Sequence, residues 1–466
     1  MHNIIVLSSA QFLFRFLPLF LIVYYLTPEQ FRNAVLFMGS IVFYAAGQPK
    51  AVLVLLALTV LNWYTGNAVF SENVKIVRGR ADEKTPVRKR RYLIAAVSID
   101  AAVLVAAKVL ALKVNSAFLP VGMSFYIFKM ISYQADMYHE VIRQRPWFTT
   151  AAAYFTMFPQ VTQGPISRYN DGFTRRGEAG REYSLDRFED GLINVTIGLS
   201  MKILLADRIG ILWNEITKIG YDSISTPLAW MGAYGYTFQL FFDFWGYSLI
   251  AAGVTQMLGM DFVLNFNHPY AAKGIGDFYR RWHATLGNWF RDYIYIPMGG
   301  SRVGTAKTIR NLLVVWLITG FWHGGTVNFI LWGLVLGLFI VLEKFVLKGA
   351  MQKVPAIGHL AVWIIIPLTW VIFAITDLKS LGLYFTRLFP LGGTSGNVNS
   401  EDYIHYARIY WPFFAASVVL CIPKVMELIQ KYRKSAVMTV VFAVLFWVSM
   451  YYGVNSSANA FMYFSF

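Results

Sequence analysis

The sequence predicts an all-α integral membrane protein, and three observations lead to this fold class. Of its 466 residues, 57% are hydrophobic and only 14% are charged, whereas a soluble domain carries roughly 25% charged residues. Aromatic residues are abundant, with 38 Phe, 27 Tyr and 14 Trp, and Trp and Tyr favour the membrane interface. Apolar runs near the length needed to cross a bilayer, about 20 residues, recur along the chain. These runs predict roughly ten to twelve spans in one polytopic bundle.

Twelve apolar segments are candidate spanning helices. They are 10–26, 31–47, 51–70, 92–112, 117–138, 188–206, 227–258, 309–322, 326–346, 357–376, 405–424 and 437–453. Because the eighth is short and the seventh is long and contains Asp243, some spans are expected to be tilted, broken or re-entrant. No internal repeat or long linker divides the sequence, which predicts a single integral domain over residues 1–466.

The positive charge also points to a membrane. The net charge is +16, and Lys and Arg gather in cytoplasmic loops of membrane proteins and near anionic lipid, so this composition favours membrane lipid over nucleic acid as the partner. Segment 72–91 is the most basic loop and is expected on the cytoplasmic side. Residues 154–165 are too few to cross and return as two helices, which predicts a re-entrant hairpin broken at Pro159 and at Gly164-Pro165.

Segment 261–308 differs from the spans because Arg, Trp, Tyr and Phe alternate densely along it. One interpretation is a set of amphipathic helices in the membrane interface. Another is the floor of a site that receives an anionic substrate from the cytoplasm, and the two interpretations are compatible. The single cysteine, Cys421, allows neither an internal disulfide nor a cysteine-based zinc site, and no histidine pair has metal-ligand spacing. We therefore expect no metal.

Two of the seven histidines stand in unusual surroundings. His323 lies in Gly320-Phe-Trp-His-Gly-Gly325, between two apolar runs, where glycines permit close approach of a substrate. His283 follows Arg281-Trp282 in the aromatic segment. Ionisable groups inside a membrane are costly and usually face a cavity or a partner. A catalytic role and a structural role at a helix junction are both open for His323 from its chemistry alone.

Asp243 is an acid in the apolar run Gln239–Ser248. Such a group must find partners inside the protein. It either orients a base or a substrate, or it is a hydrogen-bonded structural acid. Lys202 with Asp207 invites the same two interpretations.

An ordered series of motifs between residues 238 and 334 resembles the membrane-bound O-acyltransferase (MBOAT) family. Within that family the chain is similar to the bacterial branch of alginate O-acetylation and teichoic-acid D-alanylation proteins. The motifs are Asp243-Phe-Trp-Gly-Tyr-Ser248, Asn265-Phe-Asn267, Arg281-Trp-His283, Trp289-Phe-Arg-Asp-Tyr-Ile-Tyr-Ile-Pro297, Gly299-Gly-Ser-Arg302, Arg310-Asn-Leu312 and Trp322-His-Gly324.

The resemblance implies a bundle of about eleven spans, with re-entrant and interfacial helices and a tunnel across the membrane. It implies that His323, in the Trp-His-Gly motif, is the principal catalytic histidine and that His283 is the second. Transfer of an acyl group to a hydroxyl requires a base to take the hydroxyl proton, for which histidine is suited. Donors to the developing oxyanion are expected from His283 or from nearby Trp and Asn side chains. The candidates for substrate binding are Asp243, Asn267, Arg281, Asn288, Trp289, Arg291 and Trp322.

The function that follows is O-acetyl transfer at a bacterial plasma (inner) membrane by a multi-pass enzyme. The donor is expected to be a cytoplasmic acyl thioester, acetyl-CoA, used as a substrate and not as a bound cofactor. The acceptor is a cell-surface polysaccharide or peptidoglycan, and the resemblance implies a separate extracytoplasmic transferase as partner. The segment Phe241–Leu249 favours the D-alanyl branch instead, because Leu249 stands where the acetyl branch usually has Asp. D-alanyl transfer from a carrier protein to teichoic acid therefore stays open, as does a non-enzymatic transporter or scaffold.

Overall fold

The computed structural model describes residues 6–173, 183–390 and 398–455, except for the side chain of Gln352, and these ranges contain helices and no strand. The chain divides into two compact units, Met1–Val195 with Ser248–Leu264 and Thr196–Tyr247 with Asn265–Phe466. Helices α8 and α10 contribute residues to both units. That residues 1–466 form a single integral domain stays a prediction.

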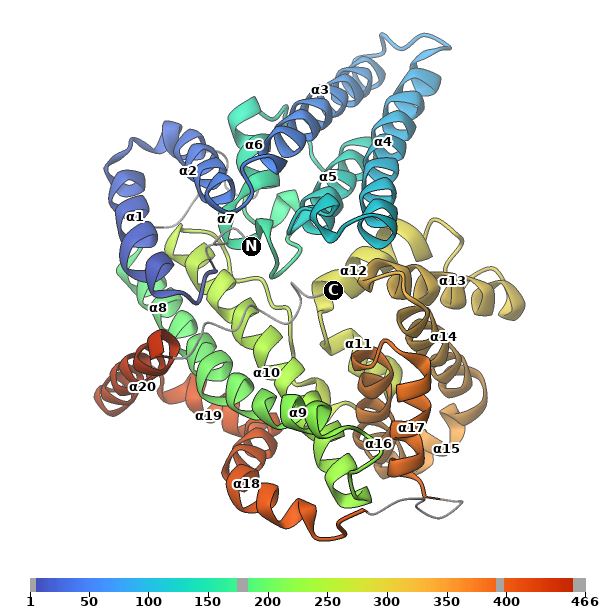
Figure 1. The fold of residues 1–466 in the computed structure, drawn as a ribbon. Helices are drawn as coiled ribbons and strands as arrows, with labels where there is room; N and C mark the ends of the chain where they lie inside the picture. The colour runs from blue at the N-terminus through green and yellow to red at the C-terminus, as the bar shows by residue number, and fades with distance from the viewer. Residues whose placement is uncertain (1–5, 174–182, 391–397, 456–466) are drawn as a thin grey trace. The chain divides into compact units, whose positions relative to one another are not determined.

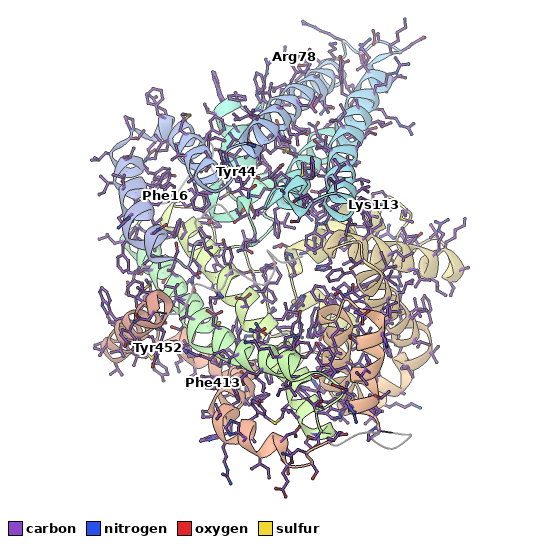
Figure 2. The ribbon with its side chains drawn as sticks, in the orientation of Figure 1. Phe16, Tyr44, Arg78, Lys113, Phe413 and Tyr452 are labelled. Carbon is purple, nitrogen blue, oxygen red and sulfur yellow. The ribbon has the colours of Figure 1, made fainter. Side chains whose placement is uncertain are left out.

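In the first unit α3 packs on α4 and α5, and α2 packs on α6 (Figure 1). The bounds of its helices are α1 Leu17–Leu26, α2 Arg32–Gly47, α3 Ala51–Val77, α4 Thr85–Lys113, α5 Met123–Tyr138, α6 Phe148–Thr156, α7 Phe158–Val161 and α8 Leu185–Leu199. Helices α3 and α4 form a long hairpin, with Arg78 at its tip and Lys113 at the opposite end of α4 (Figure 2).

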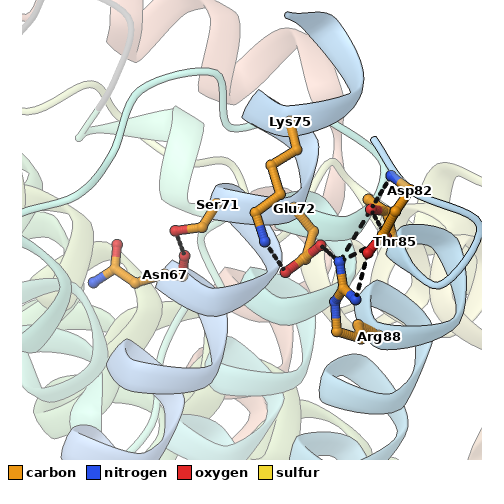
Figure 3. A network of polar contacts seen from close by, with 7 residues as sticks. All are labelled: Asn67, Ser71, Glu72, Lys75, Asp82, Thr85 and Arg88. Atoms are coloured by element: carbon orange, nitrogen blue, oxygen red, sulfur yellow. Dashed lines mark hydrogen bonds and ion pairs between the residues drawn. The ribbon is translucent and has the colours of Figure 1, made fainter. Parts of the chain in front are cut away.

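A polar network closes the tip of the α3–α4 hairpin (Figure 3). The Glu72 carboxylate is buried and pairs with Lys75 at 2.8 Å and with Arg88 of α4 at 3.1 Å. Arg88 also pairs with Asp82 at 2.8 Å, and this guanidinium holds the pKa of the Asp82 carboxyl well below its usual value. The two helices are thus joined by charge at the loop that the sequence predicts to be cytoplasmic.

The segment predicted to be a re-entrant hairpin breaks two residues before the predicted Pro159. Helix α6 ends at Thr156 and α7 begins at Phe158, so the break falls at Met157. Pro159 lies in the first turn of α7, where its missing N–H leaves no hydrogen bond unmade. Gly164 has a φ of 106°, which suits glycine and marks the second break as predicted.

The second unit holds the remaining helices. Their bounds are α9 Asp207–Ile219, α10 Thr226–Met257, α11 Ile275–Arg281, α12 Ala284–Phe290, α13 Thr305–His323, α14 Val327–Leu342, α15 Lys348–Lys353, α16 Pro355–Ala374, α17 Leu378–Leu388, α18 Asp402–Cys421, α19 Pro423–Tyr432 and α20 Ala436–Asn455. Segment 261–308 contains only short helices, of which α11 and α12 have seven residues each. As the sequence predicts, it is not a span.

All twelve predicted spans fall on helices. Five helices in the described ranges are long and apolar enough to cross a membrane alone, and a bent pair, α18 with α19, makes a sixth. The side chains of α20 illustrate why these helices need lipid: Val440, Val444 and Trp447 are more than half exposed. A patch of this kind is costly in water and favourable in a bilayer. The chain is a multi-pass membrane protein.

Helices α13 and α14 pack closely because glycines line their crossing, and α16 lies beside α14 (Figure 1). A Cβ at Gly320 would lie 2.4 Å from the Phe329 carbonyl oxygen, and a Cβ at Gly333 would lie 2.4 Å from that of Trp316. Small residues allow such approach, which is how helices gain packing energy in lipid. The crossing fixes the end of α13, where His323 stands.

Candidate functional site

His323 is the last residue of α13 and is buried. The helix stops there because Gly324 leaves helical geometry and Gly325 adopts a φ of 74°, a conformation that favours glycine. A Cβ at Gly324 would lie 2.3 Å from the Phe329 ring. The two glycines therefore turn the chain into α14 and let an aromatic side chain pass beneath the histidine.

Aromatic rings surround the His323 imidazole. Its centroid lies 4.6 Å from the Trp322 ring, and 5.0 Å from those of Trp332 and Phe373. Trp332 and Phe373 meet it at 87° and 82°, close to edge-to-face. Such contacts stabilise a fixed ring orientation. His323 is therefore held by α13, α14 and α16 together.

Asn328 keeps this arrangement in register. Its amide nitrogen donates to the carbonyl oxygens of Ile372 and Phe373, at 3.2 and 3.1 Å. Both carbonyls belong to the last turn of α16, where carbonyl oxygens have no N–H donor within the helix. Thr326 Oγ1 donates to the Asn328 Oδ1 at 2.6 Å. The start of α14 thus caps α16 and holds Phe373 against the histidine.

His283 stands at the junction of α11 and α12, outside the helices long enough to span a membrane. Its φ of 44° is unusual for a residue with a side chain, and such strain is retained where surrounding contacts fix it. The ring is buried and meets Phe244 of α10 edge-on at 4.7 Å. Burial lowers the pKa of the His283 imidazole to about 3, which keeps the ring neutral at physiological pH.

Asn265 binds this strained turn from a preceding extended segment. Its side-chain oxygen lies 2.9 Å from His283 Nδ1 and accepts from the Thr285 hydroxyl at 2.8 Å and the Thr285 backbone N–H at 3.4 Å. Its backbone carbonyl accepts from the Ala284 N–H at 2.8 Å. One asparagine therefore fixes both the backbone around His283 and the orientation of its ring.

Trp322 brings the two histidines together. Its indole lies 4.6 Å from the His323 ring and 6.4 Å from the His283 ring, measured between centroids. A second aromatic path joins the same elements, since Trp282 contacts Trp370 at 5.0 Å and Trp370 stacks on Trp332 at 5.7 Å. Residues 40 positions apart in sequence thus share one site in the second unit.

Asp243 lies on α10, one residue before Phe244, whose ring contacts His283. Its carboxylate is buried and pairs with Lys202 at 3.1 Å. Lys202 pairs in turn with Asp207 at 2.5 Å. The sequence predicts that Asp243, an acid in an apolar run, has partners inside the protein. Lys202 is such a partner, and Lys202 joins Asp243 to Asp207.

The other predicted substrate-binding residues lie along 265–295. Arg281 pairs with Asp277 at 3.1 Å, and the exposed Arg291 pairs with Asp292 at 2.7 Å. Trp289 is buried and packs on Phe290 and Tyr293. The side chains of Asn267 and Asn288 are exposed. Among the predicted substrate-binding residues, Trp322 has its ring near both histidines, at 4.6 Å from His323 and 6.4 Å from His283.

Sequence reasoning missed the residues that hold the two imidazoles. Asn265 was recognised within a motif but without a role, and Asn328 and Phe373 carried no visible signal. Its place in the Asn265-Phe-Asn267 motif was the one available indication for Asn265. For Phe373, on a different helix 50 residues after His323, only the fold shows the contact.

No group of three or more His, Cys, Asp or Glu side chains in the described ranges could hold a metal ion. The groups with acid–base or hydrogen-bonding chemistry that lie near one another are the two imidazoles and the Trp322 indole N–H. Together these can accept and donate protons beside an apolar, aromatic surface.

Comparison with known proteins identifies the family. Residues 42–384 match the membrane-bound O-acyltransferase family, MBOAT. The chain is 34% identical over 390 residues to a probable alginate O-acetylase of Pseudomonas fluorescens, covering 83% of this chain and 76% of that protein. It is 28% identical over 397 residues to a peptidoglycan O-acetyltransferase of Helicobacter pylori, covering 75% of each. A teichoic acid D-alanyltransferase of Bacillus subtilis is 28% identical over 234 residues, 48% of this chain and 58% of that one.

The family match and the predicted motifs cover the same part of the chain, including both histidines. The match spans well over half of the sequence, and the relatives with the longest alignments carry out O-acetylation by name. The chain therefore belongs to the membrane-bound O-acyltransferase family, and it is an acyltransferase.

Proposed function

We propose that this protein is an O-acetyltransferase of a bacterial plasma (inner) membrane. It moves an acetyl group from a cytoplasmic thioester, acetyl-CoA, through a tunnel in a bundle of about eleven spans, toward hydroxyls of a cell-surface polysaccharide or peptidoglycan. The observation that carries the proposal is the pair of buried imidazoles, His283 and His323, on the same indole. Neither a transporter nor a scaffold requires this pair.

His323 is the general base in this proposal. The acceptor hydroxyl attacks the thioester carbonyl while its proton passes to the imidazole, and the tetrahedral intermediate then collapses as the C–S bond breaks. The imidazolium returns the proton to the departing thiolate, so the histidine ends as it began. The fixed ring orientation from Trp332 and Phe373 supports this role, because a base must be aligned with the attacking oxygen.

Trp322 is proposed to stabilise the oxyanion. An indole N–H can only donate a hydrogen bond, and the Trp322 ring lies 4.6 Å from the His323 ring and 6.4 Å from the His283 ring, between centroids. A preorganised donor in an apolar site is worth roughly 10²–10³ in rate. The remaining predicted binding residues divide by exposure. Arg281, Arg291, Asn267 and Asn288 are proposed to receive the donor's polar part, whereas Trp289 and Asp243 are proposed to support the site from within.

Acetyl transfer is favoured over D-alanyl transfer because the O-acetylating relatives align with more of this chain than the D-alanyltransferase does. The alginate O-acetylase relative aligns over 83% of this chain, compared with 48% for the teichoic acid D-alanyltransferase. Those relatives act by name on alginate, peptidoglycan or teichoic acid. A separate extracytoplasmic transferase that receives the acetyl group is part of the proposal.

The test is the acetyl content of the cell surface. Envelope and exopolysaccharide are hydrolysed and analysed by mass spectrometry in cells that carry the wild type, His323→Gln or no protein, with membrane levels matched. The expected result is loss of O-acetyl groups in the deletion and in His323→Gln alike. His405→Gln, which changes a histidine on α18, is the matched control and is expected to behave as the wild type.

Two results would overturn the proposal. If O-acetyl content is unchanged by the deletion while surface D-alanine falls, the acyl group is D-alanine. If the deletion has an effect that His323→Gln does not share, the catalytic assignment is wrong, and a transporter or scaffold explains the phenotype better.

A further inference from the structure

The contacts around Asn265 decide which nitrogen of His283 carries the proton. The Thr285 backbone N–H can only donate, and it points at the Asn265 side-chain atom 3.4 Å away. That atom must therefore be the carbonyl oxygen and not the amide nitrogen. A carbonyl oxygen has no hydrogen to donate. It therefore accepts from His283 Nδ1 at 2.9 Å, as it accepts from the Thr285 hydroxyl at 2.8 Å.

We propose that Asn265 is a positioning residue that fixes the Nδ1–H tautomer of His283 and makes Nε2 the proton-accepting atom of the ring. In a neutral imidazole one nitrogen donates and the other accepts. With Nδ1 committed to Asn265, the ring presents an acceptor to the substrates. His283 therefore binds a hydroxyl, thiol or amide hydrogen, and it does not serve as the oxyanion donor that the sequence suggested.

Three further observations support this role. Asn265 is itself buried, with 3% of its surface exposed, so no water competes for its side-chain oxygen. Its backbone carbonyl binds the Ala284 N–H, so its position follows the turn that carries His283. Burial also keeps the ring neutral, and a neutral ring is the form in which the choice of tautomer matters. The inference rests on the proposed function only for the identity of the group that donates a hydrogen bond to His283 Nε2.

The first test reads the tautomer directly. The purified full-length protein, labelled with ¹⁵N in its histidine rings and placed in lipid nanodiscs, is studied by NMR, and the His283→Gln spectrum identifies the His283 signals. We expect a protonated Nδ1 and an unprotonated Nε2 at pH 7, and loss of this preference in Asn265→Leu. A protonated Nε2 in the wild type would overturn the proposal.

The second test uses the pH dependence of turnover with acetyl-CoA and a hydroxyl acceptor. Asn265→Leu is expected to lower kcat on the order of 10- to 100-fold, the range known for loss of the hydrogen-bond partner of a metal-bound histidine, which orients its imidazole in the same way. Asn265→Asp still accepts from Nδ1 and should recover most of this rate near neutral pH. Its carboxylate also favours the imidazolium, so the acid limb of its profile should move to higher pH. A purely structural asparagine would give no such movement.

The two tests separate this inference from the proposed function. If no acetyl transfer is found but NMR shows Nδ1 protonated, the proposed function fails and the positioning role stands. If transfer depends on His323 while NMR shows Nε2 protonated, the function stands and the positioning role is refuted. Size-exclusion elution and thermal stability show whether each variant is folded. If Asn265→Leu is not folded, the pH profile of Asn265→Asp tests the positioning role instead.

Discussion

The buried ion triad of Lys202, Asp207 and Asp243 gives the most informative perturbation of the fold around the site. Lys202 is 3% exposed at its side chain and lies 3.1 Å from Asp243 and 2.5 Å from Asp207. One ammonium therefore serves two carboxylates. With all three groups ionised, the triad carries a net negative charge. Replacement of each member has a different electrostatic consequence, so the three variants should differ in stability in a fixed order.

The magnitudes follow from the geometry. At 3.1 Å, two unit charges attract by about 5 kcal/mol at an effective dielectric constant of about 20. Lys202→Met removes the cation and leaves two carboxylates in an apolar site, which should cost about 3–5 kcal/mol. Asp243→Asn leaves Lys202 paired with Asp207 and should cost about 1–3 kcal/mol. Asp207→Asn likewise leaves one Lys–Asp pair, and it should cost least because the Asp207 side chain is 19% exposed whereas that of Asp243 is 2% exposed.

The assay is the fraction of folded protein that remains after heating in nanodiscs, followed by fluorescence-detected size exclusion. Apparent melting temperature should fall most for Lys202→Met, less for Asp243→Asn and least for Asp207→Asn. An Asp207→Asn variant as unstable as Lys202→Met would refute the argument that charge imbalance governs this triad. Equal stability of all three variants with the wild type would refute the pairing itself.

The same variants distinguish the two interpretations of Asp243. Turnover is divided by the amount of folded protein in each sample. If Asp243 only completes the triad, Asp243→Asn should retain the wild-type rate per folded molecule. A loss of that rate without a matching loss of stability would assign Asp243 a direct part in substrate binding.

Three more predictions concern the packing, the pH response and the α3–α4 hairpin. Gly320→Ala places a methyl group against the Phe329 carbonyl and should destabilise the fold by about 1–3 kcal/mol; a thermal-stability measurement that shows no decrease would contradict the close crossing. His283 binds protons more weakly when folded, since burial lowers its pKa to about 3, so stability should be complete above about pH 6.5 and fall by about 1.4 kcal/mol per pH unit below it. His283→Gln should lack that slope in unfolding measured from pH 7 to 5. Glu72→Gln loses the charge that joins Lys75 and Arg88, so amide hydrogen exchange should increase across 72–91 while turnover is unchanged; equal exchange would show that the network does not hold the hairpin.

The helices were predictable because their cause is local. Long apolar runs favour helices at membrane depth, so the twelve predicted segments fall largely on helices, and in the described ranges five helices, or six with the bent pair α18 and α19, are long and apolar enough to span. The break in the re-entrant segment was misplaced, because proline is tolerated in the first turn of a helix and α7 begins just before Pro159. Its position depends on how Phe158 packs, which the sequence does not state.

The candidate site was predictable in its residues and not in its contacts. His323 and His283 stood out because ionisable groups and glycines are conspicuous in apolar sequence. Asn265, Asn328 and Phe373 did not, because asparagine and phenylalanine are ordinary residues whose role depends on what lies beside them.

The sequence by itself therefore determined the membrane class, the helices, the family and the two histidines, because hydropathy and motif chemistry are properties of neighbouring residues. Only the tertiary structure decided that the Trp322 ring lies near both histidine rings and that the Asn265 side chain lies 2.9 Å from His283 Nδ1. These contacts join residues that are distant in sequence. They arise from glycine-lined crossings and shared hydrogen bonds, which exist only once the helices have packed.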